Sequence, residues 1–159
     1  MKIRVGMGYD VHQLSEGYDF WLGGIQLDYP MGLVGHSDAD VLLHTISDAI
    51  LGAANMRDIG FHFPDTDPKY KGADSKELLR EVVRIVGTKG YKVGNVDATV
   101  CLQKPKLLPH IPAMTACISE LLNVDLDDVS VKATTTERLG FVGREEGVSA
   151  YAVVLLEKE

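Results

Sequence analysis

The stretch SDADVLLHTISDAILGAA, residues 37–54, is the part of the sequence that most constrains the fold, because a helix start signal precedes a helical pattern of apolar residues. Ser37, followed three positions later by Asp40, has the form of a capping box with Asp in the place of Glu. It predicts a helix that begins near Asp38 and ends near Ala54. The apolar positions of that helix follow one stripe: Val41, Leu42, Ile46, Ala49, Ile50 and Ala53. Such a helix must bury its stripe against another layer.

Strand patterns on both sides of this helix supply that layer. Residues 3–8 alternate between apolar side chains and Arg or Gly, which predicts an opening strand. Residues 20–22 and 25–27, joined at Gly23-Gly24, resemble a short hairpin. The later patterns predict, in order, a helix capped by Ser75 and stopped by Gly90, a strand over 96–102, a helix over 109–123, and strands over 129–133 and 148–156. We therefore predict an α+β fold in which residues 1–159 form a single domain with one mixed β-sheet backed by helices.

Composition and charge exclude several classes of protein. Hydrophobic residues make up 45% and charged residues 25% of the 159, as in ordinary globular proteins, and the formal net charge is −7. A chain of that sign repels phosphate backbones and anionic lipid, so we expect no nucleic-acid partner and no membrane partner. The opening residues lack a signal-peptide pattern, which favours a cytoplasmic location. Cys101 and Cys117 are then expected to be buried thiols and not a disulfide.

One group of residues has the chemistry of a metal site. Asp10 and His12 are two apart at the end of the first strand, so they point to the same face. His44 lies within the predicted helix, with Asp40 and Asp48 one turn away on either side, where a carboxylate can accept the second ring N–H of a metal-bound histidine. One Asp and two His with an open fourth position suit a catalytic zinc ion. Spacing alone leaves open that the Asp-Val-His run and the helical histidine are ordinary structural residues.

Other stretches have two interpretations each. Residues 36–40 either offer backbone N–H groups to an anion or only cap the helix. The run KATTTE, residues 132–137, either holds phosphate and a hard cation or simply ends a strand. The long irregular segment 55–74 is typical of functional or mobile loops. Any anionic ligand also needs local cations, for which the candidates are Lys104, Lys106, Lys132 and Arg144.

Seven motifs together resemble one enzyme family, the 2-C-methyl-D-erythritol 2,4-cyclodiphosphate synthases, over essentially the whole chain. In chain order they are Asp10-Val11-His12, GHSDAD at 35–40, Asp58-Ile59-Gly60, FPDTD at 63–67, Pro105-Lys106, KATTTE at 132–137 and GFVGR at 140–144. The resemblance implies conversion of 4-diphosphocytidyl-2-C-methyl-D-erythritol 2-phosphate to 2-C-methyl-D-erythritol 2,4-cyclodiphosphate with release of CMP. This reaction belongs to non-mevalonate isoprenoid biosynthesis. It would make the protein a lyase that needs zinc and a second divalent ion.

The resemblance also implies roles for individual residues. Asp10, His12 and His44 would bind one Zn²⁺ per subunit, and Glu137 would bind Mg²⁺ or Mn²⁺. His36 and Thr135 would be catalytic, steadying the transferred phosphorus. The substrate's erythritol phosphate would be held by Ser37, Asp58, Ile59, Gly60, Phe63, Pro64, Asp65, Thr66 and Asp67. The cytidine and diphosphate would be held by Leu102, Gln103, Lys104, Pro105, Lys106, Leu107, Leu108, Ala133, Thr134 and Thr136.

Assembly is a further implication of the resemblance. Members of the family are homotrimers with the active site between neighbouring subunits, and an apolar cavity on the three-fold axis, near Phe141 and Arg144, takes an isoprenoid diphosphate. If the resemblance misleads, the residues allow two other functions. One is a metal-dependent phosphohydrolase that activates water at Asp10, His12 and His44, and the other is a non-catalytic cytidine-nucleotide binding module.

Overall fold

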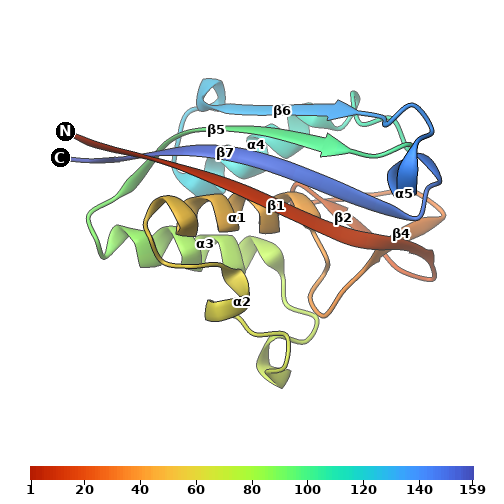
Figure 1. Ribbon diagram of the computed structural model, residues 1–159, viewed down its shortest axis with the longest axis horizontal. Helices are drawn as coiled ribbons and strands as arrows, with labels where there is room; N and C mark the ends of the chain where they lie inside the picture. Colours follow the sequence, from red (N-terminus) through yellow and green to blue (C-terminus); the bar gives the residue numbers. More distant parts are fainter.

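A five-stranded sheet with helices on one face makes up the protein, as a computed structural model of all residues 1–159 shows (Figure 1). Across the sheet the strands are β4 (Met31–Val34), β1 (Lys2–Glu16), β7 (Gly147–Lys158), β5 (Lys92–Cys101) and β6 (Val129–Thr134). Only β5 and β6 pair in parallel, so the sheet is mixed. The hairpin of β2 (Phe20–Leu22) and β3 (Ile25–Leu27) is separate from it. The predicted α+β class with a mixed, helix-backed sheet is confirmed.

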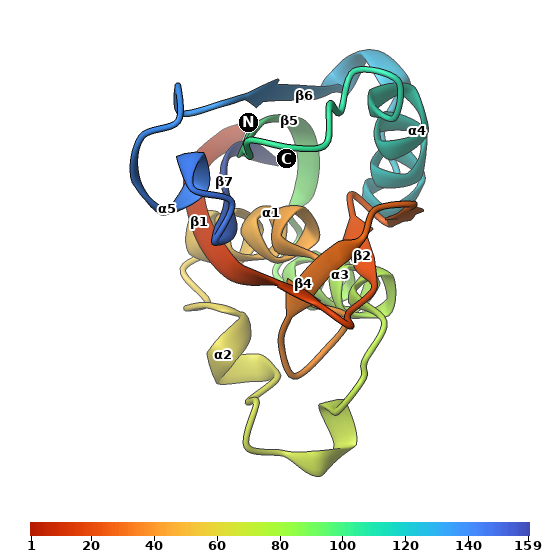
Figure 2. The same cartoon turned by 90° about the vertical axis from the view of Figure 1, so that its right-hand side faces the viewer.

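Three long helices lie on the same side of the sheet: α1 (Val41–Ala53), α3 (Ser75–Gly87) and α4 (Ile111–Leu122) (Figure 2). Helix α3 packs mainly on α1, on the side away from the sheet. The short elements are α2 (Ile59–His62), α5 (Gly140–Gly143) and two 3₁₀ turns over Pro68–Tyr70 and Leu126–Asp128. None of the helices is long and apolar enough to cross a membrane. The layers therefore run from sheet to helices, with both chain termini at one end of the sheet.

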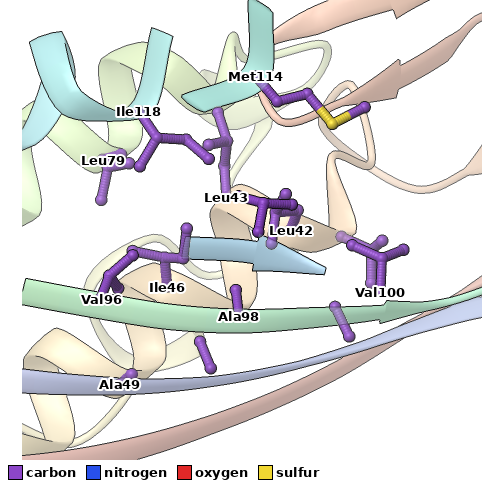
Figure 3. Close-up of a cluster of buried hydrophobic side chains, with 14 of the residues drawn as sticks. Leu42, Leu43, Ile46, Ala49, Leu79, Val96, Ala98, Val100, Met114 and Ile118 are labelled. Atoms are coloured by element: carbon purple, nitrogen blue, oxygen red, sulfur yellow. The ribbon is translucent and has the colours of Figure 1, made fainter. Parts of the chain in front are cut away.

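The core is one cluster of 35 buried apolar residues with α1 at its centre. Leu43 and Ile46 of α1 lie between Val96 and Ala98 of β5 on one side and the other helices on the other side (Figure 3). Every residue of α1 except Asp48 and Gly52 is buried, which is wider than the predicted stripe because the sheet and α3 enclose the helix from opposite sides. Burying each such Leu or Ile side chain adds about 1.5–3 kcal/mol to the free energy of unfolding.

Two glycines set how closely α1 approaches β1. A Cβ atom at Gly6 would lie 1.9 Å from the carbonyl oxygen of Ala49, and one at Gly8 would lie 2.0 Å from that of Thr45. The helix backbone therefore rests directly on the strand backbone, which only glycine permits. Because alternate residues of a strand share a face, Asp10 and His12 continue the same row beneath the first half of α1.

The opposite face of the sheet is apolar and carries no helix. Seven of its side chains are 41–67% exposed: Ile3, Val5, Met7, Tyr9 and Val11 of β1, and Tyr151 and Val153 of β7. An exposed apolar patch of this extent marks a contact surface in soluble proteins.

The predicted helix starts are wrong by one to three residues. The N-cap of α1 is Asp40, not Ser37, because the Asp40 carboxylate accepts the N–H of Leu43 and, from the β2–β3 hairpin, those of Gly23 and Gly24. This buried carboxylate therefore joins the hairpin to the helix. Burial raises its pKa, and the backbone N–H donors oppose that shift. The N-cap of α3 is likewise Asp74, and Ser75 is its first residue.

Four elements or environments differ from the predictions. Strand β1 runs on to Glu16, and its last residues pair with β4, which was not predicted. A four-residue strand containing Gly32 has too short a pattern to recognise. The segment 55–74 contains α2 and a 3₁₀ turn. Cys101 and Cys117 are free, as expected, but only half-buried.

Replacing Gly8 with alanine tests the contact between helix and strand. Gly8→Ala forces the Thr45 carbonyl away and lowers the free energy of unfolding by about 2–3 kcal/mol, the upper part of the range for overpacking. Urea denaturation at one fixed protein concentration measures this. In the control, Gly52→Ala, no atom lies within 4 Å of the new Cβ, so stability rises by about 0.5–1 kcal/mol. An unchanged midpoint for Gly8→Ala would contradict the argument.

Candidate active site

Three side chains predicted to bind metal converge at one point. Asp10 Oδ2 lies 3.1 Å from His12 Nε2 and 3.3 Å from His44 Nδ1, and the two ring nitrogens are 3.2 Å apart. Strand β1 supplies Asp10 and His12 from adjacent positions of one face, and α1 supplies His44 from above. The structure thus brings His44 to Asp10 and His12, although His44 is 32 or more positions away from both in the sequence.

Hydrogen bonds on the far side of each ring fix the histidine orientations. His12 Nδ1 lies 2.9 Å from the carbonyl oxygen of Val34, which can only accept, so this nitrogen carries the proton. His44 Nε2 lies 2.7 Å from Ser75 Oγ and 3.3 Å from Ser37 Oγ. The His12 nitrogen that faces Asp10 is therefore left with its lone pair.

The expectation that Asp40 or Asp48 supports His44 is wrong. Asp40 binds backbone N–H groups, as described above, and Asp48 Oδ1 accepts the N–H of Ile59 at 2.8 Å. Both carboxylates thus accept hydrogen bonds from backbone N–H groups and not from the ring of His44. Burial raises the pKa of Asp48, an effect that the Ile59 hydrogen bond opposes and the charge of Asp58 reinforces.

The charges in the triad favour a bound cation. Burial alone would raise the pKa of Asp10, but its contacts with His12 and His44 outweigh burial and hold the pKa well below its ordinary value. Burial likewise opposes protonation of His12, yet the neighbouring carboxylate and the Val34 carbonyl raise its pKa.

These donors fit a divalent metal ion. Asp10 Oδ2 is buried and has no hydrogen-bond partner of its own. The three donor–donor separations match the edge of about 3.3 Å expected for a tetrahedron with metal–ligand bonds near 2.0–2.1 Å. Two imidazole nitrogens and one carboxylate oxygen are donors that divalent metal ions accept in proteins.

A cavity of about 370 Å³ opens beside His12 and His44. Its other lining residues are Gly35, His36, Ser37, Ile59, Gly60, Phe63, Asp65, Tyr70 and Leu78. Most predicted erythritol-phosphate residues are therefore next to the metal triad, whereas Asp58, Pro64, Thr66 and Asp67 do not line the cavity. Asp58 instead caps α2, and the Asp67 carbonyl oxygen lies 3.2 Å from His36 Nε2. Tyr70 and Leu78 were missed, because nothing in the sequence relates them to the triad.

A second cavity, of about 420 Å³, lies between the β5–α4 connection and the end of β6. It is lined by Leu102, Gln103, Pro105, Lys106, Leu107, Leu108, Ile111, Lys132, Ala133, Thr134 and Thr135. These include nearly all the residues predicted to hold cytidine and diphosphate. Lys104 and Thr136 lie outside it, and Ile111 was not predicted. Gln103 Oε1 accepts the N–H of Arg138 at 3.3 Å, which links this cavity to the turn that carries Glu137.

The two cavities share no residue, and β6 and α2 lie on opposite sides of α1 (Figure 2). Within one chain, therefore, the structure does not bring Thr135 or Glu137 to the metal triad.

A sequence profile described as the YgbB family matches residues 3–157 of the chain. The chain belongs to the YgbB family. It is 64% identical over 159 residues to the 2-C-methyl-D-erythritol 2,4-cyclodiphosphate synthase of Bacteroides thetaiotaomicron, covering 100% of both chains. The resemblance inferred from the seven motifs is confirmed.

Solved structures of relatives in this family have the same fold. The bifunctional IspDF of Campylobacter jejuni superposes with a TM-score of 0.95 at 45% identity, over 99% of this chain and 43% of that longer chain. A 2C-methyl-D-erythritol-2,4-cyclodiphosphate synthase in a CDP-bound form superposes with a TM-score of 0.90 at 38% identity, over 97% of this chain and 100% of that one.

The candidate cations are only partly gathered. Lys106 and Lys132 line the second cavity, and Lys132 also pairs with Asp97. Lys104 is outside the cavity. Arg144 Nε donates to Glu146 Oε1 at 2.7 Å, and Phe141 is exposed at the neighbouring turn of α5.

Removing one donor of the triad tests the metal site. His44→Ala leaves two donors and lowers Zn²⁺ affinity by more than about 100-fold, beyond the usual effect of outer-shell changes. Equilibrium dialysis with elemental analysis measures it. The control is His62→Ala, because His62 bonds only to the Met56 carbonyl. Equal zinc content in His44→Ala and the parent protein would contradict the assignment.

Proposed function

We propose that the protein converts 4-diphosphocytidyl-2-C-methyl-D-erythritol 2-phosphate to 2-C-methyl-D-erythritol 2,4-cyclodiphosphate and CMP, in non-mevalonate isoprenoid biosynthesis. The observation that carries the proposal is the convergence of Asp10, His12 and His44 beside the cavity that His36 and Ser37 also line. The full-length identity with a relative of that name supports it.

The reaction joins two phosphates and needs no protein nucleophile. An oxygen of the substrate's 2-phosphate forms a bond to the β-phosphorus, and the bond from that phosphorus to the oxygen bridging to the α-phosphate breaks. CMP leaves with the electron pair. Because two anionic groups must approach in line, catalysis depends on charge neutralisation and positioning.

The residues of the first cavity serve that positioning. His36 and Ser37, just before α1, are placed to hold phosphate oxygens beside the triad, and the Ile59–Phe63 segment forms the wall for the erythritol. Zinc held by Asp10, His12 and His44 supplies Lewis-acid polarisation of the β-phosphate.

The second cavity is proposed to hold the nucleotide end. Lys106 and Lys132 supply positive charge there, and Thr134 and Thr135 offer hydroxyl groups to the diphosphate. Glu137, on the adjacent turn, would hold Mg²⁺ or Mn²⁺, which would neutralise charge on the diphosphate, and Thr135 would steady the transferred phosphorus. The CDP-bound relative supports a cytidine nucleotide as ligand.

A homotrimer is part of the proposal, because the reacting groups need both cavities and one chain keeps them apart. The bare apolar face of β1 and β7 supports assembly with further copies, in a closed ring as rotational symmetry requires. The isoprenoid diphosphate expected near Phe141 and Arg144 stays a prediction, since an axial cavity needs three chains.

Phosphorus NMR of purified protein with substrate and Zn²⁺/Mg²⁺ tests the reaction. We expect cyclic diphosphate and CMP in equal amounts, and His36→Ala lowers kcat about 10²–10³-fold, as for loss of one transition-state hydrogen bond. Inorganic phosphate as product would indicate a phosphohydrolase, and binding without turnover would indicate a nucleotide-binding module. Either result would overturn the proposal.

A charge on the bare sheet face tests assembly. Val5→Glu buries a carboxylate at the proposed interface, which costs several kcal/mol and weakens association by more than about 100-fold. Sedimentation velocity should show a smaller species, with activity reduced in parallel. Leu126→Glu, at a similarly exposed position in the 3₁₀ turn Leu126–Asp128, is the control. Parent-like sedimentation of Val5→Glu would argue against this interface.

A further inference from the structure

A chain of hydrogen bonds runs away from the metal triad behind His44. His44 Nε2 lies 2.7 Å from Ser75 Oγ, and the Ser75 hydroxyl donates to the carboxylate of Asp38, which is half-buried. Ser75 is only 1% exposed. The chain therefore joins a metal donor on α1 to the first residue of α3 through a buried hydrogen bond.

The direction of the protons along this chain follows from its last member. The Asp38 carboxylate can only accept, and it receives three donors: the Ser75 hydroxyl, the Ser75 N–H at 2.9 Å and the Asp40 N–H at 3.1 Å. Since the single Ser75 proton goes to Asp38, Ser75 Oγ must accept from His44. His44 is then protonated on Nε2, and its Nδ1 lone pair points toward Asp10 and His12.

Backbone hydrogen bonds hold this chain in place. Asp38 N–H donates to the carbonyl oxygen of Ala73 at 3.1 Å, and Gly72 N–H donates to that of His36 at 2.7 Å. Residues 72–73 are thus bound along residues 36–38 by two main-chain hydrogen bonds that directly precede the Asp38–Ser75 pair. Ser75 is also held by its own N–H, which donates to the Asp38 carboxylate.

Helix capping does not account for the Ser75 hydroxyl. The Asp74 side chain already caps α3 by accepting the N–H of Lys76. Ser37 is the other hydroxyl near His44, but it is farther, at 3.3 Å, and also accepts the N–H of Ala39. Ser75 is therefore the principal partner of the His44 ring.

We propose that Ser75, held by Asp38, is a positioning residue that fixes the tautomer and ring orientation of His44 for a divalent metal ion. The inference rests on the metal-dependent function proposed above. Partners of this kind raise metal affinity about 10–100-fold, and here the partner also ties the metal site to the end of the 55–74 segment.

The experiment compares two buried serines in the full-length protein. Zn²⁺ affinity is measured by competition with a chromophoric chelator. The coordination geometry is monitored in the Co²⁺-loaded protein by its d–d absorption spectrum. Ser75→Ala should weaken Zn²⁺ binding about 10–100-fold and alter the Co²⁺ spectrum, because the ring of His44 is no longer fixed. Ser47→Ala is the matched control. Ser47 is also 1% exposed, lies on the same helix as His44, and bonds only to the Leu43 carbonyl. It should lower thermal stability without changing either metal readout.

The outcomes separate the inference from the function on which it rests. If Ser75→Ala binds Zn²⁺ with an affinity within threefold of the parent protein and has the same Co²⁺ spectrum, the positioning role is overturned but the proposed function is not. The same holds if Ser47→Ala loses as much Zn²⁺ affinity as Ser75→Ala. If Ser75→Ala has no cooperative melt, Asp38→Asn decides. This variant keeps the shape of the side chain but removes the negative charge that accepts the Ser75 hydroxyl proton. Its Zn²⁺ affinity should therefore fall, and an unchanged Zn²⁺ affinity overturns the inference. A parent protein that binds neither ion overturns the proposed metal site itself.

Discussion

The contact of α1 with the backbone of β1 is the constraint on which the rest of the structure depends. Gly6 and Gly8 let the carbonyl oxygens of Ala49 and Thr45 lie where a Cβ atom would otherwise be. At that separation, His44 on α1 reaches Asp10 and His12, which follow Gly6 and Gly8 on the same face of β1. Metal coordination tolerates errors of only about 0.2 Å in its bonds. Gly6 and Gly8 therefore set the helix–strand separation on which the position of His44 depends.

Polar groups around the site divide into those that shape it and those that face the substrate. The carboxylates of Asp40 and Asp48 bind backbone N–H groups, and so fix the hairpin and the start of α2. Serines support the histidine instead. Asp10 directs its carboxylate toward the two histidines, and Asp65 lines the cavity. In the proposed function, the Asp10 carboxylate recruits a cation, and that cation lets a chain of net charge −7 bind a polyanionic substrate.

The sequence predicted what depends on local periodicity and spacing. The interleaved helices and strands and the shared face of Asp10 and His12 follow from such patterns, whereas most of the lining of both cavities was implied by the resemblance to the family. It did not predict features set by distant partners. Strand β4 forms by pairing with the last residues of β1, which lie far from it in the sequence. Asp40 and not Ser37 caps α1, because the Asp40 carboxylate also accepts the hairpin N–H groups of Gly23 and Gly24. Tyr70, Leu78 and Ser75 reach the site only through the path of the 55–74 segment, for which the sequence has no period.

The bare face of the sheet has a thermodynamic consequence for the protein as a population. In the proposed homotrimer, each Val, Ile or Met that this face buries against another copy adds about 1.5–3 kcal/mol to the stability of the assembled state and nothing to that of the isolated chain. By mass action, the melting temperature then rises with protein concentration. Stability becomes a property of how many copies share the solution, and dilution alone would be a denaturing condition.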